Sequence, residues 1–102
     1  MKFKLIITTP DSKINAQNIS EELVERQLSP CVQILPNITS IYRWQKKIER
    51  GKEYLILIKV LEKHIDSCKT VILKKHNYEI PEIITVDAKI LNKNYSDWFI
   101  KN

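Results

Sequence analysis

Two long runs of mostly apolar residues, the first of them rich in β-branched side chains, most restrict how this chain can fold. The first runs from Phe3 to Thr9 and the second from Glu53 to Leu61, and neither contains proline. Continuous apolar runs are typical of strands buried on both faces, whereas half-exposed strands alternate apolar and polar residues. Both runs are therefore expected to be central strands of a sheet.

Two further extended stretches contain proline. Cys31 to Trp44 carries Pro36-Asn37 near its middle, and Ile80 to Ile90 has Pro81 at its second position. Proline has no N–H to donate to a strand ladder, so it is found at sheet edges and at bulges. These two stretches are therefore expected to be the edge strands.

A first helix is predicted between the first two strands. Residues 12–28 carry apolar residues at helical spacing, namely Ala16, Ile19 and Leu23. Asp11 or Ser12 can cap its free N–H groups, and Ser29-Pro30 is expected to end it.

Two more helices are predicted in the second half of the chain. Residues 62–76 form an amphipathic segment whose core stripe is Leu61, Ile65, Cys68 and Ile72. Near the C-terminus, Asn92 or Asn94 can cap a short helix that carries Tyr95, Trp98 and Phe99. The order is then strand, helix, strand, strand, helix, strand and a terminal helix. That order predicts an α+β, ferredoxin-like (βαββαβ) sandwich, formed as a single domain over residues 1–102.

The second strand is unusually long. At about 3.3 Å per residue, Cys31 to Trp44 would extend about 45 Å, whereas a 100-residue domain has a radius of gyration of about 13 Å. The stretch must bend at Pro36 or project from the body together with its partner strand, in a long hairpin. The polar segment from Gln45 to Lys52, which holds the only glycine, Gly51, is expected to be the hairpin connection. A projecting hairpin exposes apolar side chains and an unpaired edge, which favours pairing with another subunit.

Composition excludes several classes of protein. The net charge of +5 comes mostly from lysines scattered along the chain, which argues against a nucleic-acid partner. No run approaches the roughly 20 apolar residues of a membrane span, and the N-terminus lacks signal-peptide features, so a cytoplasmic location is expected. Two cysteines in a reducing compartment are expected to be free thiols.

Three segments together resemble the CutA divalent-cation tolerance family. They are residues 28–36 continuing into Ser40-Ile41-Tyr42-Arg43-Trp44, the strand at 54–59, and His76-Asn77-Tyr78-Glu79-Ile80-Pro81-Glu82-Ile83. Thr9-Pro10-Asp11 and the Asn92, Tyr95, Trp98 pattern also fit, so the resemblance spans the chain. It implies a homotrimer that takes part in divalent metal ion tolerance and is not an enzyme.

The resemblance also implies a copper site, which this chain does not reproduce in full. Some members of the family bind copper through a cysteine and two adjacent histidines, and the matching positions here are Ile7, Lys75 and His76. His76 remains as a candidate ligand for Cu²⁺ or another divalent cation, with Cys31 as a second candidate. The alternative roles are a helix cap for His76 and a buried edge-strand thiol for Cys31.

Other candidate residues gather near the same motifs. An intersubunit cleft that holds a metal ion or a small molecule is expected to be lined by Tyr42, Arg43, Trp44, Lys59, Tyr78, Glu79 and Glu82. Alternatively, the aromatic residues pack at an interface, and Glu82 is a solvated charge. Cys68 lies on a core stripe and is expected to be a core side chain, with His64 on the exposed flank of its helix.

Two other functions share this pattern of elements. An RRM-like RNA-binding module has the same βαββαβ order but needs several stacking aromatics on its third strand, and residues 54–59 offer only Tyr54. A small enzyme with an active site between subunits is the other alternative. The sequence has no phosphate-binding glycine loop and no Ser, His and Asp set at motif spacing, so we expect no catalytic residues.

Overall fold

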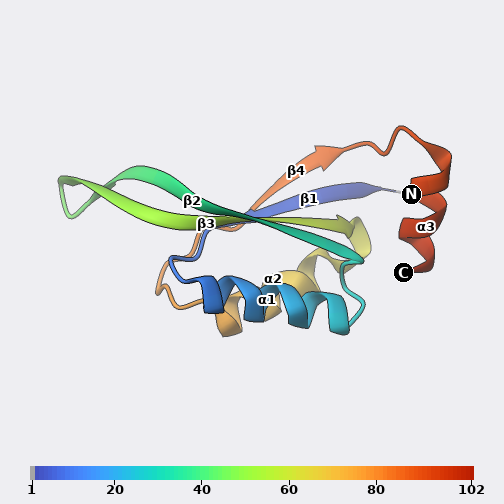
Figure 1. Ribbon diagram of the computed structural model, residues 1–102, viewed down its shortest axis with the longest axis horizontal. Coiled ribbons are helices and arrows are strands. Elements are labelled where there is room, and N and C mark those ends of the chain that lie inside the picture. Colours follow the sequence, from blue (N-terminus) through green and yellow to red (C-terminus); the bar gives the residue numbers. More distant parts are fainter. Residues whose placement is uncertain (1) are drawn as a thin grey trace.

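The computed structural model describes residues 2–102. It consists of an antiparallel four-stranded sheet, two helices on one face of that sheet and a third helix at its end (Figure 1). In chain order the elements are β1 (Phe3–Thr8), α1 (Lys13–Glu25), β2 (Cys31–Trp44), β3 (Lys47–Leu61), a 3₁₀ turn (Glu62–His64), α2 (Ile65–Lys75), β4 (Ile84–Ala88) and α3 (Lys93–Lys101). The strand order is β2-β3-β1-β4. The predicted α+β, ferredoxin-like fold is confirmed, with the two continuous apolar strands at its centre.

The hydrophobic core lies between the sheet and the helices α1 and α2. Every second residue of the central strands points into it, including Ile6, Ile56 and Ile58, and each of these side chains is fully buried. The helices contribute Ala16, Ile19, Leu23, Cys68, Val71 and Ile72. Cys68 is a core side chain, as predicted, and burial raises the pKa of its thiol to about 11.

The opposite face of the sheet is also apolar, and we call it the apolar face. Residues paired across antiparallel strands share a face, which places Leu5 with Val86 and Ile7 with Leu57 and Ile84. Val86 and Ile84 are 42% and 48% exposed. The third helix covers only one end of this face, where Phe99 packs edge-on against Phe3 with ring centroids 5.0 Å apart.

Helix α1 is capped by a side chain at its start and by the backbone at its end. Ser12 accepts a hydrogen bond from the N–H of Asn15, as predicted for the first turn. The helix ends at Glu25, earlier than Ser29-Pro30, because Gln27 adopts a left-handed conformation with φ of 56°. The N–H groups of Gln27 and Leu28 then reach the carbonyls of Val24 and Leu23, a Schellman motif with glutamine in the position usually taken by glycine.

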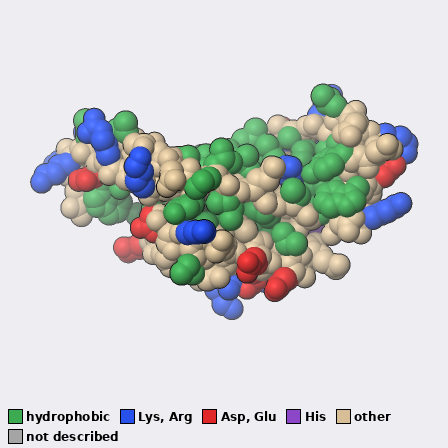
Figure 2. Space-filling model, in the orientation of Figure 1, with side chains coloured by type: hydrophobic (Ala, Val, Ile, Leu, Met, Phe, Trp, Pro, Cys, Tyr) green, Lys and Arg blue, Asp and Glu red, His purple; other side chains and the backbone are tan. Residues whose placement is uncertain are grey.

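The hairpin of β2 and β3 projects from the body, as its length predicts. The molecule measures 46 × 24 × 22 Å, and Figure 1 shows the hairpin extending along the longest axis beyond both helices. We call the projecting part, residues 38–53, the arm. Lys and Arg side chains gather at its tip (Figure 2).

The connection within the arm is shorter than predicted. Only Gln45 and Lys46 connect the strands, and their φ values of 48° and 66° have the signs of a type I′ turn. The expected connection from Gln45 to Lys52 is therefore wrong beyond Lys46, because residues 47–52 extend β3. Gly51 lies inside that strand, opposite Ser40.

A β-bulge at Pro36-Asn37 exchanges the faces on which the odd- and even-numbered side chains of β2 lie in the arm. Leu35 pairs with Leu55 and Ile38 with Glu53, so β2 has one residue more than β3 at this point. Side chains alternate between the two faces of a strand. After the extra residue, the even-numbered side chains of β2 therefore lie on the same face of the arm as Glu53. Pro36 thus lies on an edge strand and at a bulge, as its missing N–H predicts.

The second half of the chain differs from prediction in the bounds of the second helix and of the fourth strand, and agrees in part at the cap of the third helix. The segment 62–76 begins with a 3₁₀ turn before α2 and ends at Lys75. The fourth strand is Ile84–Ala88 and not residues 80–90, so Pro81 lies in the loop before it. Asn92 occupies the N-cap position of α3, although its side chain makes no capping hydrogen bond.

Candidate functional site

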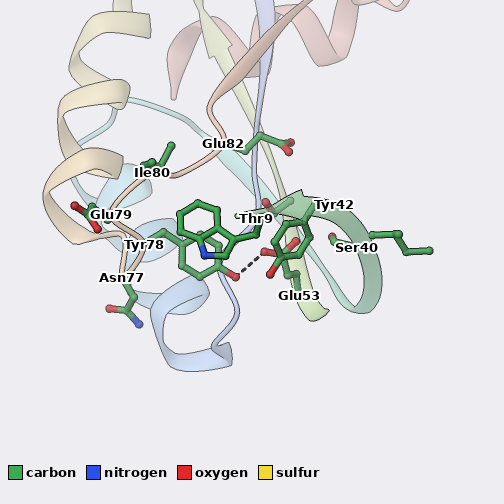
Figure 3. Close-up of a pocket in the computed structure, with 11 residues that line it drawn as sticks. Thr9, Ser40, Tyr42, Glu53, Asn77, Tyr78, Glu79, Ile80 and Glu82 are labelled. Carbon is green, nitrogen blue, oxygen red and sulfur yellow. Dashed lines mark hydrogen bonds between the residues drawn. The ribbon is translucent and has the colours of Figure 1, made fainter. Parts of the chain in front are cut away.

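A cleft of about 700 Å³ separates the arm from the loop between α2 and β4 (Figure 3). Strands β2 and β3 supply one wall, and loop residues 77–82 supply the other. The lining side chains are aromatic, acidic, aliphatic or small and polar: Thr9, Ser40, Ile41, Tyr42, Trp44, Glu53, Asn77, Tyr78, Glu79, Ile80 and Glu82. Such a volume falls in the range of small-molecule sites.

The bulge and the alternation of strand residues bring the arm's aromatic side chains to this cleft. Tyr42 pairs with Glu49 and Trp44 with Lys47. Both lie an even number of residues along β2 from Ile38, the partner of Glu53. Both aromatic residues therefore share a face with Glu53, and each is 48% exposed. The cleft has aromatic side chains on the arm because β2 carries one extra residue.

The opposite wall is held to the body by a buried asparagine of α1. The Nδ2 group of Asn15 donates to the carbonyl of Lys75 at 2.8 Å, and its Oδ1 accepts from the N–H of Asn77 at 3.1 Å. One side chain thus satisfies the end of α2 and the start of the loop, where helix carbonyls would otherwise lack partners. The loop enters the cleft from a fixed point.

Tyr78 and Glu53 form the polar contact at the bottom of the cleft. The Tyr78 hydroxyl donates to Oε2 of Glu53 at 2.6 Å, and the Glu53 side chain is buried although it comes from a projecting strand (Figure 3). Burial, together with the adjacent carboxylate of Glu53, raises the pKa of Tyr78 well above its usual range. The hydroxyl therefore remains a donor at neutral pH.

His76 lies next to this pair, in a site that favours its neutral imidazole form. Its ring is 4.7 Å from that of Tyr78, and Nδ1 accepts the backbone N–H of Tyr78 at 3.1 Å. Burial lowers the pKa of His76 despite the nearby carboxylates of Asp11 and Glu53. This is opposite to the imidazolium expected of a histidine that caps a helix. Its Nε2 is buried and has no hydrogen-bond partner among the described residues.

The predicted cleft residues divide into two groups. Five of them line this cleft, namely Tyr42, Trp44, Tyr78, Glu79 and Glu82. Arg43 is not among the described residues that line it, although Ile41, two positions earlier on β2, is. Lys59 lies six residues from Glu53 along β3, which is about 20 Å of strand.

Cys31 and Lys59 lie together at the other end of the sheet. They are cross-strand partners, and the ammonium of Lys59 lies 3.7 Å from the Cys31 thiol. The same ammonium lies 3.4 Å from the hydroxyl of Tyr95 on α3. The two candidate metal ligands, His76 and Cys31, are therefore at separate places in this chain. Both cysteines are free thiols, as predicted.

The residues at the family's copper positions do not fit a copper ion. Ile7 has no donor atom, and the Lys75 ammonium lies 3.0 Å from the Glu22 carboxylate in an ion pair. His76 uses Nδ1 for the Tyr78 backbone. Across residues 2–102, no three His, Cys, Asp or Glu side chains converge as a metal site would require.

Several cleft residues were not predicted from the sequence. Glu53 reads as the polar start of an apolar strand, and nothing local signals its contact with Tyr78, 25 residues away. Thr9 follows β1, and Asn77 lies in the loop after α2. Functional side chains are common in loops and at the ends of elements, so their position could have marked them as candidates. Tyr54 packs against the core between sheet and helices, so it offers no stacking surface of the kind an RRM uses.

Comparisons with known proteins agree with the fold and the motifs. A model of the family described as CutA1 divalent ion tolerance protein matches residues 4–102. The divalent-cation tolerance protein CutA of Thermus thermophilus is 35% identical over 102 residues, which cover 100% of this chain and 98% of that protein. In residues 2–102, no helix combines the length and the apolarity that a membrane crossing requires.

Solved structures are similar over nearly the whole chain. The crystal structure of CutA from Xylella fastidiosa has a TM-score of 0.93 at 35% identity, with 99% of this chain and 97% of that one covered. A structure from Archaeoglobus fulgidus, described as a periplasmic divalent cation tolerance protein CutA, has a TM-score of 0.92 at 27% identity. It covers 97% of this chain and 96% of its own.

Proposed function

This chain belongs to the CutA1 divalent ion tolerance family, and on that premise we propose that it is a non-enzymatic homotrimer of the response to divalent metal ions. The family resemblance implies the trimer, and the apolar face of the sheet is the structural observation that supports association. Leu5, Ile7 and Leu57 lie there beside the exposed Ile84 and Val86. A contiguous apolar sheet face of this kind marks an interaction surface.

The arm supports association in a second way. Strands β2 and β4 are the edges of the sheet, and an unpaired edge is a template for pairing with another chain. Ile41 and Ile48 on the arm are both 63% exposed, far from the core of this subunit. Pairing between arms of neighbouring subunits covers both the edge and these side chains.

The metal-related role is proposed to act through a ligand of the cleft. The residues at the copper positions lack a donor set, whereas the cleft combines polar and aromatic groups at the root of the arm. A ligand held there contacts the part of the chain that reaches a neighbouring subunit. Binding can therefore alter the assembly without a metal ion bound directly by this chain.

We propose the cytoplasm as the compartment, on the basis of the two free thiols. Reduced cysteines are the rule in the cytosol, whereas oxidising compartments favour disulfides. The relative from Archaeoglobus fulgidus is described as periplasmic. Cell fractionation with immunodetection tests this: recovery in a periplasmic extract contradicts the proposal.

Size-exclusion chromatography with light scattering tests the trimer. We expect one species at three times the chain mass of 12.1 kDa. Val86→Glu places a charge on the apolar face and should shift the protein to monomer, whereas Ile14→Glu, on the exposed side of α1, should not. A wild-type protein that is monomeric at micromolar concentration contradicts the proposal.

Calorimetric titration with CuCl₂ tests the indirect metal role. We expect wild type and His76→Ala to give the same weak heats, because Nδ1 is occupied and no further donors converge among residues 2–102. Tight binding by the wild type that is lost in His76→Ala would show a direct copper site and contradict the cleft-mediated role.

A further inference from the structure

The cleft is acidic in a basic protein. Glu53, Glu79 and Glu82 line it, and no Lys or Arg side chain is among the lining residues of the described chain. The chain as a whole carries a formal net charge of +5. Acidic side chains are thus concentrated where the molecule is hollow, and they favour a cationic ligand there.

Glu53 offers a cation an acceptor oxygen that no other group of residues 2–102 uses. It is buried and accepts one hydrogen bond, from Tyr78, and no ion pair among residues 2–102 includes it. A carboxylate has two oxygens that accept hydrogen bonds, and among residues 2–102 only Oε2 of Glu53 has a donor. A cation in the cleft supplies the missing partner.

The arrangement of the carboxylates favours an extended cation and not a metal ion. No three acidic, His or Cys side chains of the described chain converge on one point, so the three glutamates present separate anionic positions. Tyr42, Trp44 and Tyr78 lie among them, and aromatic faces attract ammonium groups and pack against methylene chains. A linear chain of methylenes with ammonium groups at intervals matches both features.

We propose that the cleft binds a linear polyamine, with its ammonium groups paired to Glu53, Glu79 and Glu82 and its methylenes against the aromatic side chains. The proposal deepens the proposed function, because it names the chemical class of the cleft ligand. It does not require the trimer, since all the residues invoked belong to one chain.

Isothermal titration of the full chain with spermidine tests the proposal. We expect saturable binding that weakens several-fold in Glu79→Gln and in Glu82→Gln, since each variant removes one charge that pairs with an ammonium group. Both glutamates are exposed, so these variants are expected to fold. Glu25→Gln, at the exposed end of α1, is the matched control and should bind like the wild type.

Two further measurements separate a built site from general charge attraction. Trp44→Ala should weaken spermidine binding although it removes no charge, and MgCl₂ at equal charge concentration should displace little spermidine. No saturable heat at millimolar spermidine, equal affinity in all the variants, or displacement by Mg²⁺ charge for charge would each overturn the proposal. A protein that is trimeric by light scattering and binds no spermidine overturns this proposal alone.

Discussion

The Tyr78 hydroxyl donates a hydrogen bond to Oε2 of Glu53 at 2.6 Å, joining the loop before β4 to the root of the arm. The two residues belong to segments that share no strand ladder. This contact therefore fixes one wall of the cleft against the other. It also gives a buried carboxylate its hydrogen-bond donor.

Replacing Tyr78 with phenylalanine should destabilise the fold by about 1–3 kcal/mol, because a buried acceptor loses its partner. Urea denaturation followed by circular dichroism measures the change. Tyr42→Phe is the control, since that ring is half exposed and no hydrogen bond of its hydroxyl is found among residues 2–102. Equal stability of wild type and Tyr78→Phe would mean that Glu53 gains nothing from the hydroxyl.

The same variant should change the stability at high pH. The pKa of Tyr78 is raised in the folded state, so the unfolded chain loses this proton first as the pH rises above about 10. The contribution of Tyr78 is therefore complete below about pH 10 and is lost above it. Tyr78→Phe should show a shallower alkaline decline than the wild type.

His76 should make the protein less stable in acid. Burial lowers its pKa in the folded state, so the unfolded chain takes up this proton first as the pH falls below about 6.5. The stability contribution is present above that pH and is lost below it. Thermal melts at pH 7 and pH 5 should show a smaller difference for His76→Asn than for wild type.

The control for His76 is the chain's other histidine, His64, which is half-buried in the turn before α2. His64→Asn should keep the pH dependence of the wild type. If His64→Asn flattens the profile and His76→Asn does not, the assignment to His76 is wrong.

Gln27→Gly should stabilise the protein by about 0.5–1 kcal/mol. Gln27 has a φ of 56° at the end of α1, where glycine carries no steric cost. Gln17→Gly in the exposed interior of the same helix should have the opposite sign, with a loss of about 1 kcal/mol. Urea midpoints of the two variants check the pair, and changes of the same sign would contradict the role of Gln27 as a cap.

Asn15→Leu should cost about 2 kcal/mol, because its amide makes two hydrogen bonds that hold the start of the cleft loop. Hydrogen exchange should quicken at Asn77, whose N–H donates to Oδ1. Asn18→Leu, on the exposed side of the same helix, should leave both the stability and the exchange unchanged. Unchanged exchange at Asn77 in Asn15→Leu would show that the loop is held by other contacts.

The division into central and edge strands was predictable because it depends on local composition. Runs without proline, such as residues 3–9, became central strands, and Pro36 marked an edge. An apolar run reflects burial of a strand on both faces, and proline reflects a missing N–H. Both are properties of a short segment, so the segment alone was sufficient to predict them.

The arm and the cleft needed information that is not local. Residues 47–52 contain a single large apolar side chain, Ile48, because the arm stands in solvent, so they lack the alternation that identifies a strand. The turn at Gln45-Lys46 has positive φ values without the Asn-Gly or Asp-Gly signal of such turns. The burial of Glu53 depends on its contact with Tyr78. No local pattern predicts a contact between residues 25 positions apart in the sequence.

The bulge at Pro36-Asn37 has an evolutionary consequence. Because the facing of the arm depends on whether an odd or an even number of residues separates Leu35 from Trp44, a single-residue insertion or deletion there exchanges the two surfaces of the arm. Arg43 would then turn toward Glu53, and the aromatic side chains would turn away. Paired insertions preserve the lining, so changes in arm length that keep this cleft are expected to come in steps of two.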